Sequence, residues 1–157
     1  MMYTASAVGD HGMIWSAIAL VQAWRRHHRG QPWRRQLLRV AAGLAVESAL
    51  VNGPIKWVFR RSRPVFEGER PLHLRQPRTS SFPSGHASAA FFAAALLRED
   101  DTFWPTYYLA AALVACSRAH VKIHHASDVV GGMLVGAVLG EALRRAMPLS
   151  AEMTDRH

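Results

Sequence analysis

Apolar residues occur in five stretches along the chain, separated by polar and arginine-rich segments. A helix that crosses the hydrocarbon core of a bilayer needs ~20 residues, and several stretches reach that length only with their flanks. In the last stretch, no charged residue occurs between Asp128 and Glu141. The pattern therefore predicts an all-α protein, an integral membrane bundle of about five transmembrane helices, over a water-soluble bundle with short core helices. The stretches cover residues 12–24, 37–59, 82–97, 103–116 and 129–143.

Small and polar residues inside the stretches indicate how the helices pack. Gly132, Gly136 and Gly140 recur every four residues, so they form one stripe that allows close contact with another helix. Glu47 lies within the second stretch, where a carboxylate facing lipid is costly, and we expect it to face the bundle or a polar cavity. Residues 60–81 contain three prolines without helical periodicity and predict a long loop.

The composition fits one domain. Half of the 157 residues are apolar and 19% are charged, which is too apolar for a disordered chain. We expect a single domain over residues 1–157, with a core at roughly 37–145 and a tail at 146–157. Cys116 is the only cysteine, which excludes an intrachain disulfide and a cysteine-based zinc site.

The formal charge of +8 indicates an anionic partner, which could be nucleic acid, a membrane surface or a phosphorylated substrate. The basic residues mark the ends of the apolar stretches and do not follow one soluble face, which argues against nucleic acid. A phosphorylated substrate or a bilayer fits this distribution better.

Polar residues gather in three clusters at the ends of the apolar stretches. The first cluster closes the second stretch and the next opens the third stretch, so both lie on one side of the membrane. The fourth stretch returns the chain to that side, where the last cluster begins. Five helices therefore bring all three clusters to one face of the membrane. The clusters comprise residues 56–64, 83–86 and 117–128.

The last cluster allows two kinds of chemistry. His120, His124 and Asp128 are spaced four apart and share a face if the segment is helical. They could bind a metal ion. Alternatively, Asp128 could hold the ring of His124 in one tautomer and leave the other nitrogen free as a nucleophile. Nearby cations would repel a divalent metal and suit a phosphoryl group instead; they are Lys56, Arg63 and Arg118.

The middle cluster, Pro83 to His86, precedes an apolar stretch. Its serine and glycine lie where the backbone N–H groups of a helix start are unpaired, which makes an anion site. An ordinary capped helix start can have the same kind of sequence, so this segment alone does not indicate an anion site. It does so only together with the other clusters.

Together, the three clusters resemble the three-part signature of the type 2 phosphatidic acid phosphatase (PAP2) superfamily, membrane lipid phosphatases related to vanadium haloperoxidases. Two features depart from the common pattern. Only two apolar stretches precede the first cluster, where many bacterial relatives have three, and His125-Ala126 stands where Tyr-Pro is frequent. The matching motifs are Lys56-x6-Arg63-Pro64, Pro83-Ser84-Gly85-His86 and Ser117-Arg118-x5-His124-x3-Asp128.

The resemblance implies a fold with the PAP2 and haloperoxidase-like core, and a role for each matched residue. His124 would attack phosphorus to give a phosphohistidine, with Asp128 orienting its ring. His86 would protonate the leaving oxygen and then activate the water that hydrolyses the intermediate. No metal or other cofactor is implied. The phosphoryl oxygens would be held by Lys56, Arg63, Ser84, Gly85 and Arg118.

The expected activity is that of a metal-independent lipid phosphatase, which hydrolyses a phosphomonoester or diphosphate of a membrane lipid. Resemblance to small bacterial members favours polyprenyl phosphates and diphosphates, with phosphatidate-type lipids next. The active-site loop would be residues 60–81. The alternatives are a metal-binding membrane protein that uses His120, His124 and Asp128, or a haloperoxidase-like enzyme that binds vanadate. The roles of His120, Lys122 and Glu47 stay open.

Arginine placement predicts the orientation. Five arginines lie within residues 25–36, and no Lys or Arg precedes them. The positive-inside rule then places this connector in the cytoplasm and the polar clusters on the extracytoplasmic face of the cell membrane. The first ten residues lack a basic region, so no cleavable signal peptide is expected.

Overall fold

The computed structural model describes residues 13–64 and 79–149. Every regular element within these ranges is helical, as the sequence predicts. The predicted loop at 60–81 is seen only at its two ends, since residues 65–78 lie outside the described part, as does most of the predicted tail. The helices are α2 Met13–His28, α3 Trp33–Leu50, η2 Val51–Ile55, α4 Lys56–Phe59, α5 Gly85–Leu97, α6 Trp104–His120 and α7 Ala126–Ala146.

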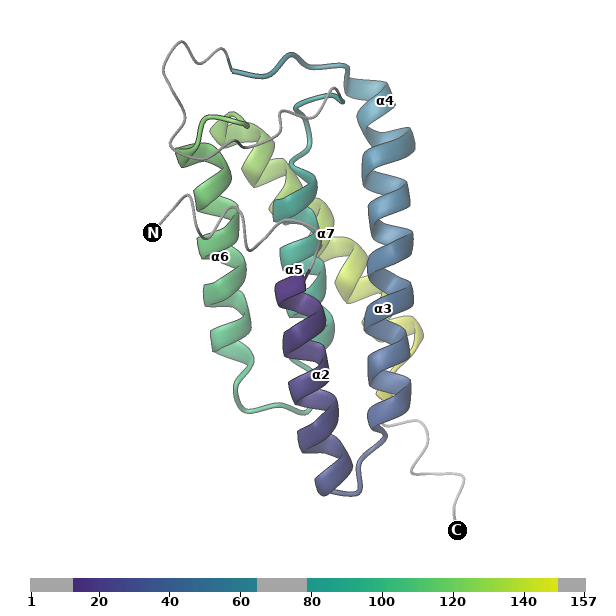
Figure 1. Cartoon of the computed structure of the whole chain (residues 1–157). Coiled ribbons are helices and arrows are strands. Elements are labelled where there is room, and N and C mark those ends of the chain that lie inside the picture. Colours follow the sequence, from purple (N-terminus) through teal and green to yellow (C-terminus); the bar gives the residue numbers. More distant parts are fainter. Residues whose placement is uncertain (1–12, 65–78, 150–157) are drawn as a thin grey trace.

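Each predicted apolar stretch coincides with one long helical segment (Figure 1). The second stretch forms a single rod in which α3, the wide turn η2 and α4 follow one another. The rod is kinked at Gly53, whose backbone (φ −95°, ψ −107°) is not helical, next to Pro54, which has no N–H to donate. The kink lies one turn before Lys56 and therefore sets the direction of its side chain.

Among the described helices, α7 alone is long and apolar enough to cross a membrane by length and composition, and α5 is apolar but shorter. The other long helices include charged residues: α2 has Arg25 and Arg26 in its last turn, and α3 contains Arg39 and Glu47. The prediction of an all-α bundle is confirmed, and the count of about five membrane crossings stays a prediction.

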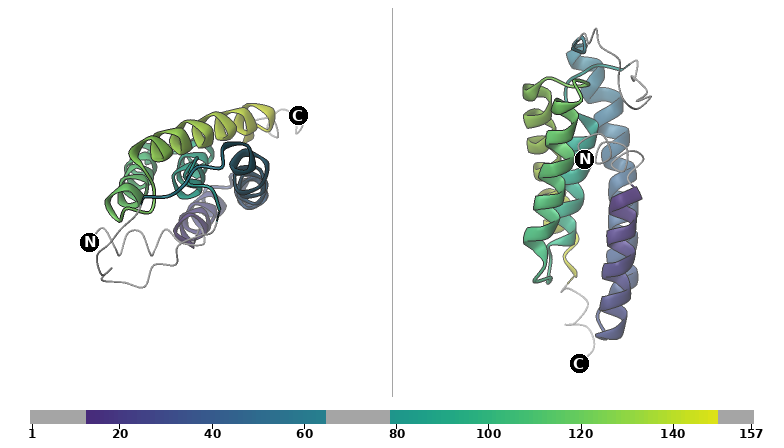
Figure 2. Two further views of the ribbon diagram at one scale, coloured as in Figure 1. Left: turned by 90° about the horizontal axis from the view of Figure 1, so that it is seen from above. Right: turned by 60° about the vertical axis from the view of Figure 1, so that its left-hand side comes forward.

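Helix α5 occupies the centre of the bundle, with the other long helices around it (Figure 2). Its closest neighbour is α7, because the glycine stripe of α7 faces the backbone of α5. A Cβ atom at Gly132 would overlap the Ser84 carbonyl oxygen, and one at Gly136 would overlap that of Ser88. The predicted packing seam is confirmed, and it fixes the N-terminal end of α5 against the start of α7.

Replacing Gly136 by valine should destabilise the protein by about 3 kcal/mol, because an added side chain must push the two backbones apart. Thermal unfolding in detergent measures the effect, with Leu134→Val on the exposed face of the same helix as control. An unfolding temperature equal to that of the wild type would show that α5 and α7 do not pack through this stripe.

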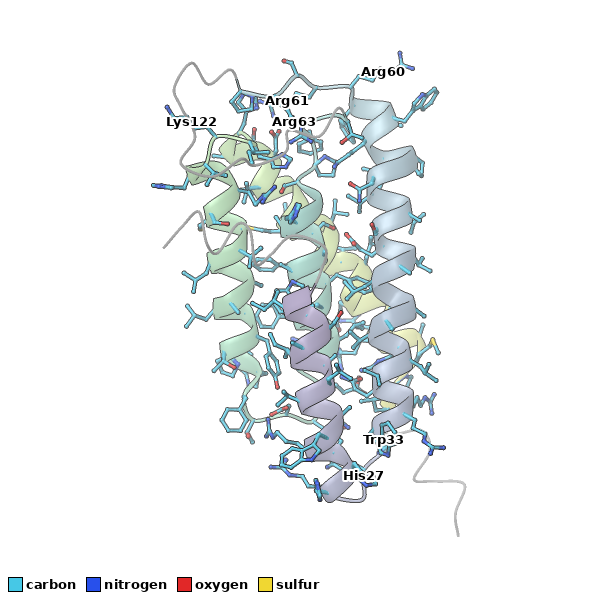
Figure 3. All side chains as sticks on the ribbon, in the orientation of Figure 1. His27, Trp33, Arg60, Arg61, Arg63 and Lys122 are labelled. Atoms are coloured by element: carbon cyan, nitrogen blue, oxygen red, sulfur yellow. The ribbon has the colours of Figure 1, made fainter. Side chains whose placement is uncertain are left out.

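The two ends of the bundle have different polar groups (Figure 3). At the end near His27 and Trp33, Arg39 is buried and donates to Glu99 (2.6 Å) and to the Met147 carbonyl (2.7 Å). This network accounts for the arginine within α3, since a buried charge needs a partner. All three predicted polar clusters lie at the opposite end, as the count of crossings predicts.

Candidate active site

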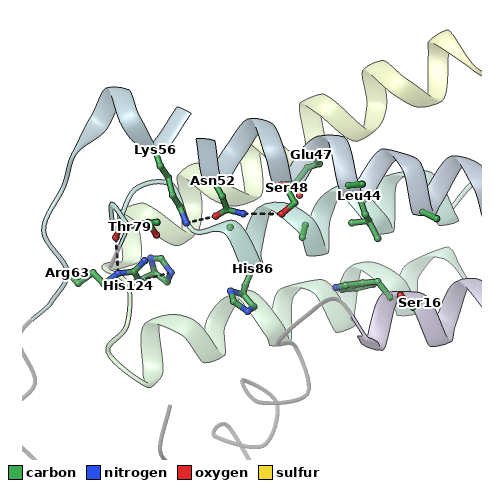
Figure 4. A pocket seen from close by; sticks show the side chains of 15 residues that line it. Ser16, Leu44, Glu47, Ser48, Asn52, Lys56, Arg63, Thr79, His86 and His124 are labelled. Carbon is green, nitrogen blue, oxygen red and sulfur yellow. Dashed lines mark hydrogen bonds between the residues drawn. The ribbon is translucent and has the colours of Figure 1, made fainter. Parts of the chain in front are cut away.

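A cavity of about 490 Å³ opens at the end of the bundle where the three clusters meet (Figure 4). It runs along one face of the α3–α4 rod and is bordered by α2 and α5. Five of the eight predicted site residues line it: Lys56, Arg63, Gly85, His86 and His124. The other three, Ser84, Arg118 and Asp128, are buried behind its wall.

Lys56 and Arg63 provide the positive charge of the cavity. The Lys56 ammonium is buried and donates to Asn52 Oδ1 (2.7 Å), one helical turn earlier. Arg63 follows α4 and is anchored by backbone carbonyls, among them those of Thr79 (3.2 Å) and Ile123 (3.1 Å). Burial lowers the pKa of Arg63, and Arg118 adds to this, yet a guanidinium stays charged at neutral pH. Two fixed cations at one cavity wall attract an anion.

His124 lies in the connection between α6 and α7, with its two ring nitrogens in different surroundings. Nδ1 is 2.7 Å from the carbonyl oxygen of Ser81, and because a carbonyl only accepts, Nδ1 must carry the proton. Nε2 therefore holds the lone pair, 3.3 Å from the Arg63 guanidinium. Burial, followed by the charge of Arg63, lowers the pKa of His124 from 6.5 to about 3. The ring is neutral at pH 7 and can act as a nucleophile.

The position of Asp128 differs from the one expected. Its Oδ2 is 3.9 Å from His124 Nδ1, and the ring is held by the Ser81 carbonyl instead. Asp128 accepts from the Ser81 hydroxyl and from the His125 backbone N–H (2.8 Å). The distance to His124 is longer than a hydrogen bond because α6 ends at His120 and a loop replaces the helical spacing of four, and the orienting role of Asp128 stays a prediction. Asp128 therefore reaches His124 through Ser81.

The same helix break separates the three residues of the metal alternative. His120 is the last residue of α6, His124 lies in the loop, and Asp128 is in the first turn of α7. Within residues 13–64 and 79–149, no three His, Cys, Asp or Glu side chains come together as metal ligands. His120, His124 and Asp128 therefore do not share one helix face, as the metal-binding alternative assumed.

The start of α5 forms another wall of the cavity. Ser84 is the N-cap residue: its hydroxyl accepts from the Ala87 N–H (3.4 Å), and its own N–H donates to the Asp128 carbonyl (2.9 Å). Gly85 lies so close to the α3–α4 rod that an added Cβ would be 3.0 Å from Asn52 Oδ1. The positive end of the α5 dipole thus faces the cavity. His86, in the first turn, projects into it (Figure 4).

Arg118 is buried near the end of α6. Its charge acts on Lys56, Arg63 and His124, which places it close to all three. Its backbone carbonyl accepts from the N–H groups of Ile123 and His124 (both 3.3 Å), so it also shapes the loop that carries His124.

Three contributors were not predicted from the sequence. Asn52 lies four residues before Lys56, a helical spacing that could have indicated the contact. Ser81 connects Asp128 with His124, and only the fold reveals its two bonds. Arg61, just after α4, donates to Asp128 Oδ1 (2.7 Å). The expectation that Glu47 faces the bundle is confirmed, since it accepts from Ser88 and lines the cavity.

The cavity combines two functions in one place. Cationic side chains and a helix N-terminus can bind a tetrahedral oxyanion. A neutral imidazole with its lone pair fixed beside them can attack the central atom of that anion. A second histidine, His86, lies on the same cavity wall and can transfer a proton.

The sequence profile of the PAP2 superfamily matches residues 36–151. Decaprenylphosphoryl-5-phosphoribose phosphatase of Mycobacterium tuberculosis is 34% identical over 135 residues, which cover 86% of this chain and 72% of that protein. Undecaprenyl-diphosphatase of Sulfolobus acidocaldarius is 35% identical over 94 residues, or 57% of this chain and 45% of that protein. The crystal structure of a transmembrane PAP2-type phosphatidylglycerolphosphate phosphatase from Bacillus subtilis superposes with a TM-score of 0.70 at 23% identity, covering 99% of this chain and 77% of that one.

Proposed function

This chain belongs to the PAP2 superfamily of membrane lipid phosphatases, and we propose that it cleaves the phosphate of a polyprenyl-type lipid through a phosphohistidine intermediate. The observation that carries the mechanism is the state of His124: neutral, with Nδ1 bonded to a carbonyl and Nε2 directed at the phosphate-binding cations.

In the first step, the His124 Nε2 lone pair forms a bond to phosphorus while the bond to the ester oxygen breaks. His86 gives its proton to that oxygen, so that the lipid leaves as an alcohol or, from a diphosphate, as a lipid monophosphate. In the second step, His86 takes a proton from water, whose oxygen bonds to phosphorus as the P–N bond breaks. Inorganic phosphate and neutral His124 are regenerated.

The surrounding residues stabilise the charge that develops on the phosphoryl oxygens. Lys56 and Arg63 line the cavity, where their cationic groups can bind these oxygens directly. The start of α5 at Ser84 and Gly85 adds backbone donors. Arg118 lies close enough to both cations to act on them electrostatically, and it adds a further positive charge that attracts the phosphoryl group. Asp128 keeps the Ser81 segment in place, which stabilises the positive ring that forms when His124 attacks.

The substrate class follows from the relatives and from the location of the site. The Mycobacterium and Sulfolobus proteins are named for decaprenyl and undecaprenyl phosphate compounds, which supports a polyprenyl substrate ahead of phosphatidate. We place the protein in the cell membrane with several crossings, its active site at the extracytoplasmic interface, where diffusion within the bilayer delivers such lipids. Residues 60–81 would then border the site as its loop.

The protonation state of His124 gives a pH prediction. Because its pKa is lowered to about 3, the ring should remain neutral as pH falls from about 8 to about 4 in the protein without phosphate. At His124 the folded state binds fewer protons than the unfolded chain does. This residue therefore lowers the free energy of unfolding at pH values below its ordinary pKa, and it has no such effect at pH values above it. Nitrogen NMR of labelled histidine measures this. A His124 resonance with a titration midpoint near its ordinary pKa would contradict the proposed nucleophile.

The proposed function is tested by phosphate release from detergent-purified protein with excess chelator. The substrates are farnesyl diphosphate, farnesyl phosphate and phosphatidate. We expect release to continue at within about twofold of the rate without chelator, and the prenyl substrates to be faster. Release that stops on chelation would instead favour metal-dependent chemistry, and faster release from phosphatidate would overturn the polyprenyl preference.

A further inference from the structure

Asn52 lines the cavity beside the phosphate-binding cations and joins two turns of the α3–α4 rod. Its side-chain oxygen accepts from the Lys56 ammonium (2.7 Å), and its amide nitrogen donates to Ser48 Oγ (3.2 Å; Figure 4). A lysine ammonium can only donate hydrogen bonds, so the amide oxygen must face it. The two bonds therefore hold the amide in one orientation, with its oxygen directed at Lys56.

The wide turn η2 contains Asn52 as its second residue, directly before Gly53, where the backbone leaves helical geometry. Such turns inside an α-helix occur frequently at functional sites. The hydrogen bond from Lys56 to Asn52 spans this kink and fixes the ammonium relative to the rod on both sides of it.

The start of α5 lies directly against this pair of side chains. A Cβ atom added to Gly85 would be 3.0 Å from Asn52 Oδ1 and 3.5 Å from Lys56 Nζ. The ammonium is thus close to the N-terminus of α5, whose first N–H groups carry a partial positive charge. Two positive groups so close repel each other, and a flexible lysine side chain stays there only if an acceptor holds it. The Asn52 oxygen, next to both groups, is that acceptor.

An amide fits this place better than a carboxylate would. A carboxylate at hydrogen-bond distance would form an ion pair with Lys56 and offset the charge that attracts a phosphate. An amide oxygen accepts the same hydrogen bond and leaves that charge in place. Glu47, whose carboxylate acts on Lys56, lies about two and a half helical turns earlier and is bonded to Ser88.

We propose that Asn52 is a positioning residue for the phosphatase reaction: its amide oxygen holds the Lys56 ammonium beside the start of α5 without neutralising it. The ammonium and the first N–H groups of α5 then bind the same phosphoryl group. This assignment rests on the proposed function, to which the binding of the phosphoryl group by Lys56 belongs. Asn52 acts through Lys56 and does not touch the reacting atoms.

The test compares two substitutions of Asn52 with farnesyl diphosphate as substrate. Asn52→Asp keeps the size of the side chain and adds a negative charge beside Lys56, so kcat/KM should fall about 100-fold and inhibition by inorganic phosphate should weaken to a similar extent. Asn52→Leu removes the hydrogen bond without adding charge and should lower kcat/KM only about tenfold. Because the Asn52 side chain is exposed, both variants should unfold within a few degrees of the wild type.

Two comparisons separate a role through Lys56 from a general effect. Gln31→Glu makes the same change from amide to carboxylate in the connection between α2 and α3, and should keep activity within about twofold. Asn52→Leu is also measured in a Lys56→Met background, where its effect should shrink to less than about twofold because the group that it positions is gone. A purely structural role for Asn52 would give equal losses in both backgrounds.

Equal losses in the two backgrounds would overturn the assignment, and so would a loss in Asn52→Asp no larger than that in Asn52→Leu. Both results leave phosphate release by the wild-type protein in place. A wild-type protein that releases no phosphate from farnesyl diphosphate would instead contradict the proposed function itself.

Discussion

Replacing His124 by alanine should reduce phosphate release at least ~10⁴-fold, because the variant lacks the atom that forms the bond to phosphorus. The side chain is buried, and its removal leaves the Ser81 carbonyl and the Arg63 guanidinium without one partner each. Binding of the phosphate group should be largely retained, since the cations stay in place. The measurement is single-turnover phosphate release at saturating lipid.

Two controls separate lost chemistry from lost structure. His28→Ala removes an exposed histidine at the opposite end of the bundle and should keep full activity. The unfolding temperature of His124→Ala in detergent should remain within a few degrees of the wild-type value. If His124→Ala kept a tenth or more of the wild-type rate, the covalent mechanism would be wrong.

Replacing Arg63 by alanine should have the next largest effect, a loss of about 10³-fold in kcat/KM. Arg63 is the cation that contacts both the cavity and His124 Nε2. Its removal takes away a fixed positive charge where charge develops in the transition state. Because Arg63 also attracts the phosphate of the bound substrate before the reaction, we expect KM to rise as kcat falls.

A lysine at position 63 should recover only part of this loss, because an ammonium cannot reproduce the planar contacts to the carbonyls of Thr79 and Ile123. Arg29→Ala, an exposed arginine near the end of α2, is the matched control. Loss of activity in Arg29→Ala equal to that in Arg63→Ala would indicate a general charge effect and contradict a specific role for Arg63.

The sequence predicts those features that depend on spacing along the chain. The ends of the apolar stretches place Lys56, Gly85 and His124 on one side, and the structure brings them together at one cavity. The glycine stripe of α7 can also be predicted from the sequence, because residues four apart lie on the same face of a helix. The first prediction depends on the number of apolar stretches and the second on helix periodicity, and both can be read from the sequence.

The parts that could not be predicted depend on where loops lie and on backbone atoms. His124 is held by the Ser81 carbonyl, an acceptor that every residue possesses and no motif can mark. Asp128 was assigned to His124 by a helical spacing that the end of α6 at His120 interrupts. Arg61 can donate to Asp128 because the chain after α4 folds back over the start of α7, which its position in the sequence does not indicate.

The central claim, a covalent bond between His124 and phosphorus, is tested most directly by trapping it. Protein is mixed with radiolabelled para-nitrophenyl phosphate, whose good leaving group needs no acid, and quenched in alkaline detergent, where phosphohistidine is stable. The account predicts label on the peptide containing His124, more label in His86→Ala because hydrolysis is slowed, and none in His124→Ala. Release of phosphate by the wild-type protein with no trapped label, even in His86→Ala, would contradict it.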